Sequence, residues 1–317
     1  MTKIAVFDAK PYDRASFDAA NAGRYAFRYF ETRLTAASVP LAEGCAGVCA
    51  FVNDAVDAAT VEGLVARGVK VLALRCAGYN NVDFKAAFEK GLTVVRVPAY
   101  SPYAVAEHAM ALLMTLNRHL HKAAARTRDF NFSLVGLTGM DLHGKTAGVV
   151  GTGKIGRIFC DICKGLGMRV LAYDAFPNPA SGLDYVTLDR LLAESDVVSL
   201  HCPLTPETHH LFNAETIGMM KPGAFLVNTS RGGLVESGAL LDALRSGRLG
   251  GAGLDVYEEE SDWFYEDRSQ RVNQDKVLAL LVSMPNVLVT SHQAFLTQEA
   301  LANIAATTCA NLDAYFS

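Results

Sequence analysis

The sequence predicts an α/β protein of two Rossmann-like or flavodoxin-like domains, each a doubly wound parallel β-sheet, with a cleft between the domains. Short runs rich in valine, isoleucine and leucine alternate with stretches of helical periodicity, as expected for strands buried on both faces of a parallel sheet. These runs form two series that are separated by a long helical stretch. The length of 317 residues suits two domains.

The individual strands can be located within each series. The first series predicts five strands: IAVF from Ile4, YAFRYF from Tyr25, GVCAFV from Gly47, VKVLAL from Val69 and LTVVRV from Leu92. The second series predicts six strands: TAGVVG from Thr146, followed by MRVLAY, DVVSLH, AFLVNT, AGLDVY and NVLVTS, which ends near Ser291.

A long apolar stretch lies between the two series. Ser101 followed by Pro102 is typical of a helix start, because serine caps free N–H groups and proline has no N–H to leave unpaired. Residues 104–120 are apolar around most of the helix circumference, so we expect another domain or another subunit to cover them. A later segment, residues 258–276, is polar and aperiodic, which predicts a surface excursion with mostly solvated charges.

Composition excludes several classes of protein. Lysine and arginine number 29 against 33 aspartate and glutamate, a net charge of −4 without a concentrated basic stretch, so no nucleic-acid partner is expected. The N-terminal apolar run is interrupted at Asp8, too early for a secretion signal, and no apolar segment approaches the roughly 18 residues of a membrane span. We therefore expect no association with membranes. Seven cysteines without framework spacing predict reduced thiols and a reducing compartment, which points to a cytoplasmic protein.

A glycine-rich turn, GTGKIG at residues 151–156, follows an apolar strand and opens a helix. Gly151 permits a tight bend, and Gly153 allows the backbone to approach a pyrophosphate. Gly156 lets helix and strand pack closely, so that the helix N-terminus at Lys154 and Ile155 points at the anion.

An acidic residue follows at the expected distance. Asp174 ends the next strand, 18 residues after Gly156, close to where a carboxylate accepts hydrogen bonds from an adenosine ribose. Because no arginine follows closely to bind a ribose phosphate, the pattern favours NAD over NADP. The alternative is a glycine turn that only connects a strand to a helix.

Further motifs accompany this turn. They are RCAGYNNVD from Arg75, VPAYSPYAVAEHA from Val97, HCPLTPETHHLFN from His201, NTSRGGLVE from Asn228, LDVYEEE from Leu254 and SHQAF from Ser291. Together they resemble the D-2-hydroxyacid dehydrogenase family, and within it the fermentative D-lactate branch. The resemblance implies a discontinuous substrate domain of residues 1–100 and 292–317, an NAD-binding domain of residues 101–291, and a homo-oligomer, a dimer or tetramer, formed through the helix after Ser101.

The resemblance also implies NAD-dependent reduction of a small 2-oxo acid, with pyruvate and D-lactate as the expected pair. Arg231 follows an apolar strand, where a guanidinium can bind a carboxylate and polarise the ketone. His292 ends the last strand and suits a proton shuttle near neutral pH. A carboxylate partner would stabilise its imidazolium, and the residues alone leave Glu258, Glu259 and Glu260 open. The family pattern selects Glu260, the fifth residue after the aspartate of LDVY.

Other site residues follow from their motif positions. By resemblance, the turn with Gly78 and Tyr79 binds the substrate carboxylate through backbone amides, and Tyr100, Phe295 and Phe51 line the pocket; the alternative for these three aromatics is a core position. The remaining expected cofactor residues are Cys202, Pro203 and Thr208 beside the adenine or ribose, and Asn228, Thr229 and Asp255 around the nicotinamide ribose and carboxamide. Two departures from the family pattern, Ser261 and Ser291 in place of prolines, bear on the subfamily.

Competing interpretations concern the other histidines and cysteines and the function itself. Cys160 and Cys163 fall in a predicted helix, where their spacing indicates packing, and no metal site is expected. Structural roles, mostly without an acidic partner, are expected for His108, His119, His121, His143, His201, His209 and His210. The alternative functions are a dehydrogenase for a bulkier 2-oxo acid, branched-chain or phenyl-substituted, and an NAD-sensing binding protein.

Overall fold

The computed structural model describes residues 1–260 and 263–317. The chain forms two compact units, one of Met1–Ser101 with Leu296–Ser317 and one of Pro102–Phe295. Each unit is built on its own parallel sheet, as the sequence predicts.

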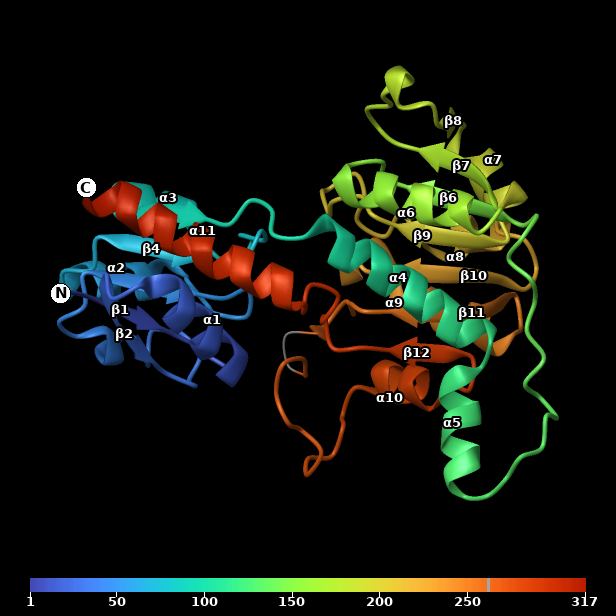
Figure 1. The fold of residues 1–317 in the computed structure, drawn as a ribbon, viewed down its shortest axis with the longest axis horizontal. Helices are drawn as coiled ribbons and strands as arrows, with labels where there is room; N and C mark the ends of the chain where they lie inside the picture. The colour runs from blue at the N-terminus through green and yellow to red at the C-terminus, as the bar shows by residue number, and fades with distance from the viewer. Residues whose placement is uncertain (261–262) are drawn as a thin grey trace. The chain divides into compact units, whose positions relative to one another are not determined.

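The first unit contains a five-stranded sheet with the strand order β2-β1-β3-β4-β5 (Figure 1). Helices α1 and α11 pack against each other, and an apolar cluster that includes Phe17 and Leu312 lies between them and the sheet. The elements are β1 (Thr2–Val6), α1 (Pro11–Asn21), β2 (Tyr25–Tyr29), η1 (Val39–Ala42), β3 (Gly47–Ala50), α2 (Ala58–Ala66), β4 (Val71–Leu74), α3 (Phe84–Glu89), β5 (Thr93–Arg96) and α11 (Gln298–Phe316).

The second unit contains a seven-stranded sheet with the order β12-β11-β10-β9-β6-β7-β8. The strand order reverses between β6 and β9, where ligands bind in open sheets of this type. The elements are α4 (Pro102–Asn117), α5 (Leu120–Arg128), β6 (Thr146–Val150), α6 (Lys154–Gly165), β7 (Arg169–Tyr173), η2 (Pro179–Ser181), β8 (Asp184–Tyr185), α7 (Leu188–Glu194), β9 (Val197–Leu200), α8 (Ala214–Met219), β10 (Ala224–Asn228), η3 (Gly232–Leu234), α9 (Ser237–Arg245), β11 (Leu249–Leu254), α10 (Lys276–Ser283) and β12 (Val287–Val289).

The predicted strands are all present, and the structure adds one. Strand β8 spans only Asp184 and Tyr185 and pairs with β7, so it is too short to produce a periodic pattern in the sequence. All strands of both sheets pair in parallel, and the inner strands β3, β4, β6 and β9 are buried along their whole length, as expected for strands covered on both faces.

The long apolar helix is shorter than predicted and is covered within its own unit. It ends at Asn117, because His119 adopts a left-handed backbone conformation with φ of 51° and a second helix, α5, begins at Leu120. Helix α4 packs on α6, β10 and β11, with most of its apolar side chains buried there. Its apolar circumference therefore does not require a second subunit.

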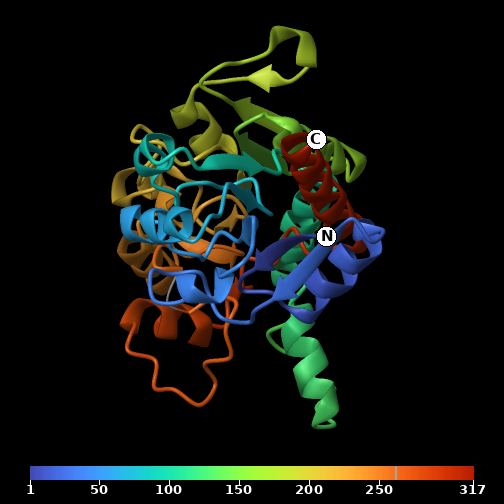
Figure 2. The same ribbon diagram turned by 90° about the vertical axis from the view of Figure 1, so that its left-hand side faces the viewer.

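Helix α5 and the segment after it carry exposed apolar side chains instead. The helix projects away from the sheet of its unit (Figure 2). The exposed apolar residues of this arm are Leu120, Phe130, Phe132, Leu134 and Val135.

The polar segment of residues 258–276 is only partly a surface excursion. Several of its charges are exposed, including Glu266, Asp267 and Arg271. Phe264 is buried, however, and Trp263 and Tyr265 pack against the core of the second unit. The aromatic triplet WFY anchors this segment to the fold, because large apolar side chains gain most from leaving water.

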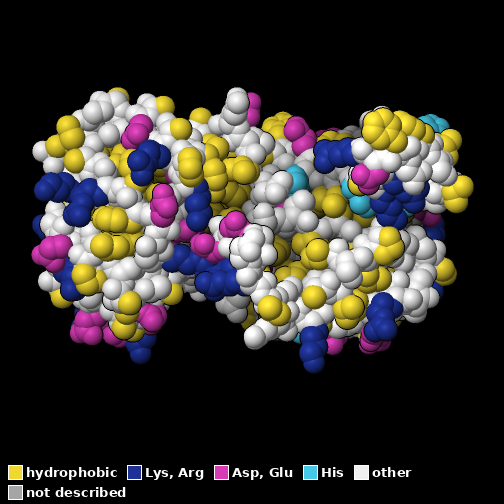
Figure 3. Space-filling model, turned by 90° about the horizontal axis from the view of Figure 1, so that it is seen from below, with side chains coloured by type: hydrophobic (Ala, Val, Ile, Leu, Met, Phe, Trp, Pro, Cys, Tyr) yellow, Lys and Arg dark blue, Asp and Glu magenta, His cyan; other side chains and the backbone are white. Residues whose placement is uncertain are grey.

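The remaining composition-based expectations concern thiols, charge and membranes. All seven cysteines are free and buried. On the face of the described residues shown in Figure 3, lysine and arginine side chains are interspersed with acidic and hydrophobic ones. None of the helices in residues 1–260 and 263–317 combines the length and apolarity that a membrane crossing requires.

Candidate active site

The glycine turn after β6 has the geometry of a dinucleotide site. Gly151 has φ of 91°, and a Cβ atom there would overlap the backbone of Cys202, which follows β9. A Cβ at Gly156 would overlap the carbonyl oxygen of Gly151, so both positions require glycine. Gly153 faces open space and caps α6 without a side-chain hydrogen bond, which leaves the first N–H groups of the helix to an anion. Lys154 is exposed at this end, and Ile155 packs against the core.

Asp174 lies at the end of β7 beside this turn. Its Oδ2 accepts hydrogen bonds from the backbone N–H of Thr152 at 2.6 Å and from the Thr152 hydroxyl at 2.9 Å, and its Oδ1 accepts one from the N–H of Phe176 at 2.9 Å. Partial burial raises the pKa of Asp174, but these hydrogen bonds outweigh it and hold the pKa below its usual range. The carboxylate is thus charged at neutral pH and suited to accept hydrogen bonds from ribose hydroxyls.

A cavity of about 480 Å³ joins the turn to the residues after β9. It is lined by Gly151, Gly153, Asp174, Cys202, Pro203 and Thr208, all expected cofactor residues, together with His201 and other side chains. The Thr208 hydroxyl donates to the carbonyl of Pro203 at 2.7 Å and closes the wall of the cavity. Because the cavity lies at the reversal of strand order and contains both the anion-binding turn and the carboxylate, these residues fit an adenine dinucleotide.

Three adjacent strands carry the expected catalytic residues. Arg231 follows β10, Glu260 follows β11 and His292 follows β12, and these strands are neighbours in the sheet. A Cβ at Gly232 would overlap the backbone of Tyr257, so the loop of Arg231 packs directly on the loop that leads to Glu260.

His292 and Glu260 form a close pair. Nδ1 of His292 lies 2.7 Å from Oε1 of Glu260, and Oε2 of Glu260 accepts a hydrogen bond from the N–H of Tyr257 at 2.9 Å. Both side chains are mostly buried, at 17% and 20% exposure. When Nδ1–H donates its hydrogen bond to the carboxylate, Nε2 of the imidazole is available for a substrate oxygen.

Asp255 holds the loop of His292 in place. Its Oδ1 accepts from the Thr290 hydroxyl at 2.5 Å and from the N–H of Gln293 at 2.9 Å, and its Oδ2 accepts from the N–H of Ala294 at 2.8 Å. His108 of α4 adds an ion pair, with Nε2 at 3.3 Å from Oδ1. Burial raises the pKa of Asp255, but the hydrogen bonds from His108, Thr290 and Ala294 outweigh it and lower the pKa.

Arg231 is half-buried with most of its donors available. Among the described residues, its guanidinium makes one hydrogen bond, from Nη1 to the carbonyl of Ser230 at 2.7 Å. The side chain of Asn228 fixes the loop, because Nδ2 donates to the carbonyl of Arg231 and Oδ1 accepts from the N–H of Ser230. Thr229 is buried, and its hydroxyl has no hydrogen-bond partner within the described residues, so it can bind a ligand.

The first unit carries four of the expected substrate residues. Asn81 joins two of their loops, since its Nδ2 donates to the carbonyls of Phe51 and Asp54 at 2.9 and 2.8 Å. Tyr79 is 46% exposed beside Gly78, and the Arg96 guanidinium lies over its ring. Phe51 is buried under the guanidinium of Arg75.

Tyr100, the fourth of these residues, and Phe295, the fifth expected substrate residue, lie next to the boundaries between the two units in the sequence. In the first unit, the carbonyl of Tyr100 accepts a hydrogen bond from Asn303 of α11 at 2.7 Å. Phe295 is buried in the second unit. Of the two departures from the family pattern, Ser291 is exposed next to His292, and Ser261 lies outside the described residues.

Sequence reasoning missed several neighbours of these groups. The expectation that the other histidines mostly lack an acidic partner is wrong for His108, which pairs with Asp255, and for His210, whose Nε2 lies 2.5 Å from Oε1 of Glu258. Tyr265 was also missed; its hydroxyl donates to the carbonyl of His292 at 3.2 Å. The aromatic triplet in a charged segment was the available signal for Tyr265.

The buried cysteines of α6 serve packing. Cys160 and Cys163 lie in the apolar cluster beneath the helix, and burial raises the pKa of each thiol to about 12. Protonated thiols are poor metal ligands and poor nucleophiles.

The chain matches a known protein family and is similar to known proteins along nearly its whole length. Residues 110–294 match the family described as D-isomer specific 2-hydroxyacid dehydrogenase, NAD binding domain. The chain is 53% identical over 315 residues to a 2-hydroxyacid dehydrogenase homolog of Haemophilus influenzae, covering 98% of this chain and 95% of the relative. It is 52% identical over 314 residues to the D-lactate dehydrogenase of Escherichia coli, with the same coverage.

A solved structure shows the same likeness. A structure described as the pyruvate reductase of Chlamydomonas reinhardtii has a TM-score of 0.95 at 46% identity, covering 99% of this chain and 96% of the other. The chain therefore belongs to the D-isomer specific 2-hydroxyacid dehydrogenases, which are NAD-dependent oxidoreductases.

Proposed function

We propose that this enzyme catalyses the reversible, NADH-dependent reduction of pyruvate to D-lactate. The observation that carries the proposal is the close pairing of His292, after β12, with Glu260, after the neighbouring strand β11, next to the strand β10 that precedes Arg231. The chain's likeness to proteins named D-lactate dehydrogenase and pyruvate reductase supports this substrate.

The side chains divide the work of the reaction. Arg231 binds the carboxylate of the 2-oxo acid through two N–H groups and draws electron density from the ketone. His292, protonated at Nε2, donates its proton to the carbonyl oxygen and is reprotonated from solvent after product release. Glu260 keeps the imidazole oriented and stabilises its positive charge. Bound NADH supplies the hydride that the carbonyl carbon receives.

We infer that the two units have separate roles. The unit of residues 102–295 binds NAD and carries Arg231, Glu260 and His292. The first unit supplies the substrate side through Gly78, Tyr79, Tyr100 and Phe51, and Phe295 adds an aromatic wall.

Exposed apolar residues and buried thiols bear on the assembly of the enzyme and on its compartment. The exposed apolar residues of the arm formed by α5 and the segment after it support a homo-oligomer in which a second copy covers this arm. The seven free, buried thiols support a reducing compartment, and we propose the cytoplasm.

The test is a panel of 2-oxo acids with purified enzyme, scored by loss of NADH absorbance and by chiral analysis of the product. Pyruvate should be preferred over phenylpyruvate and branched-chain 2-oxo acids, NADH over NADPH, and the product should be D-lactate. Preference for a bulkier acid would overturn the substrate assignment. Binding of NADH without turnover of any member of the panel would overturn the enzymatic proposal.

An arginine variant makes the test site-specific. Arg231→Lys should lower kcat/KM for pyruvate by roughly a hundredfold, because a lysine cannot make the two parallel hydrogen bonds. Arg245→Lys, at an exposed arginine of α9, is the matched control and should behave as the unmodified enzyme.

A further inference from the structure

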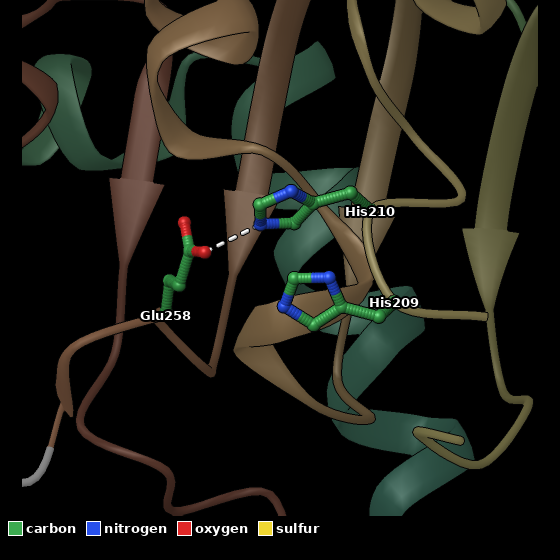
Figure 4. Close-up of side chains that lie close together, drawn as sticks. All are labelled: His209, His210 and Glu258. Atoms are coloured by element: carbon green, nitrogen blue, oxygen red, sulfur yellow. Dashed lines mark hydrogen bonds and ion pairs between the residues drawn. The ribbon is translucent and has the colours of Figure 1, made fainter. Parts of the chain in front are cut away.

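Three potential metal ligands lie together outside the residues assigned to catalysis. They are His209 and His210, which follow the cofactor loop after β9, and Glu258, which follows β11. One ligand atom from each side chain lies within 4.8 Å of the other two. Figure 4 shows the two imidazole rings next to each other, with Glu258 facing them and hydrogen-bonded to His210.

From this cluster we propose that His209, His210 and Glu258 form a binding site for a divalent transition-metal ion of the zinc class. The proposal goes beyond the dehydrogenase activity and does not depend on it. It also departs from the sequence-based expectations of no metal site and of structural roles for His209 and His210.

Two of the three ligands are already held in place. Oε2 of Glu258 accepts hydrogen bonds from the hydroxyl and the N–H of Ser237 at 2.9 and 3.3 Å, which aims Oε1 at the histidines. The backbone N–H of His210 donates to the carbonyl of Gly233 at 2.8 Å, and its φ of 50° fixes the direction of the side chain. Such outer contacts orient ligands and raise metal affinity.

The third ligand provides access and adjustment. His209 is exposed, and its ring lies 3.9 Å from that of His210, centre to centre, at an interplanar angle of 30°. Ligands of a tetrahedral zinc ion lie about 3.3 Å apart, and the exposed side chain of His209 can turn to reach that spacing. The ion takes the place of the proton on Nε2 of His210, which moves to Nδ1 or to solvent, and the contact between His210 and Glu258 widens.

The donor set decides the class of metal. Two imidazole nitrogens and one carboxylate oxygen suit Zn²⁺, Co²⁺ or Ni²⁺, whereas Mg²⁺ and Ca²⁺ require mostly oxygen ligands. Three protein ligands leave a fourth position for water. The ion would tie the loop after β9 to the loop after β11, and through Ser237 to the start of α9.

The direct test is titration of tag-free protein, stripped with EDTA and desalted, with ZnCl₂ in a calorimeter. One Zn²⁺ should bind per chain. His209→Ala and Glu258→Gln should each weaken binding by about a hundredfold or more, since each removes a ligand. His143→Ala is the matched control, an exposed histidine outside the cluster, and should bind as the unmodified protein does.

Two measurements separate a lost ligand from a damaged fold. Without metal, the Tm should be the same for the unmodified protein and for His209→Ala, because His209 is exposed. Zn²⁺ should raise the Tm of the unmodified protein but not that of His209→Ala. Co²⁺ should give visible d–d absorption that His209→Ala lacks. Absence of saturable Zn²⁺ binding, or equal binding by His209→Ala and the unmodified protein, would overturn the site.

Discussion

The backbone N–H of His292 donates to the backbone carbonyl of Asp255 at 2.7 Å. The carboxylate of the same aspartate accepts the next two backbone N–H groups, those of Gln293 and Ala294. His292 has φ of 52°, a conformation that a residue with a Cβ rarely adopts and that its surroundings must impose. Asp255 thus acts on the proton donor through the main chain and is a positioning residue.

Asp255→Asn should separate this positioning role from a direct contact with substrate. In this variant one carboxylate oxygen is replaced by an NH2 group, which cannot accept a hydrogen bond from the backbone N–H that faces it. Because the loop of His292 is then less well held, we expect kcat to fall by roughly tenfold to a hundredfold, together with a lower Tm. Steady-state kinetics with calorimetric melting is the measurement. Asp267→Asn, at an exposed aspartate, serves as control. Unchanged kcat and Tm in Asp255→Asn would show that the loop holds itself.

His108→Leu tests the same network from α4. Leucine retains the packing of the helix but removes the ion pair with Asp255. We expect kcat to fall by less than in Asp255→Asn, with the KM for NADH nearly unchanged, because the main-chain hydrogen bonds of Asp255 remain. A loss confined to KM for NADH would instead indicate that His108 supports the cofactor.

His292→Ala should lower kcat by at least roughly a hundredfold, the lower end of the effect of a lost acid catalyst. NADH binding, followed by fluorescence titration, should stay within about twofold, because the imidazole contributes to proton transfer rather than to the adenine pocket. Glu260→Gln should lower kcat less, since the amide oxygen can still accept a hydrogen bond from Nδ1–H but carries no negative charge to stabilise the imidazolium. Near-normal turnover in His292→Ala would place the proton donor elsewhere.

Asp174→Ser should relax the preference between cofactors. The carboxylate accepts hydrogen bonds from ribose hydroxyls and repels a ribose phosphate, so its removal should raise KM for NADH about tenfold while lowering KM for NADPH. The comparison of kcat/KM for the two cofactors measures the change. An unaltered ratio would mean that Asp174 only braces Thr152 in the glycine turn.

Acid should destabilise the enzyme through His201. Burial lowers the pKa of His201 to about 3 from an ordinary value of 6.5. Below pH 6.5 His201 binds a proton in the unfolded chain but stays neutral in the folded protein. The contribution of His201 to the free energy of unfolding is therefore complete above that pH and declines as the pH falls towards 3. Denaturant titrations between about pH 7 and pH 4 should show a shallower decline for His201→Gln. Identical pH dependence in both proteins would contradict the assignment.

Features that require a particular type of residue could be predicted from the sequence, and features without such a requirement could not. Runs of valine, isoleucine and leucine predicted the eleven strands, because burial on both faces demands apolar side chains. The glycine turn was visible because Gly151 and Gly156 admit no side chain at their close contacts. Helix α4 was predicted too long, since the left-handed turn at His119 has no sequence signature of its own.

The sequence by itself thus determined the parallel α/β architecture, the dinucleotide turn and the candidates for catalysis, since these depend on local periodicity and on motifs. The family pattern had selected Glu260 for His292, where the residues alone left three glutamates open, but only the tertiary structure showed that Asp255 meets His108 and Glu258 meets His210. The physical reason is that these pairs join loops at the ends of different strands, and sheet order, not spacing along the chain, sets the distance between their side chains.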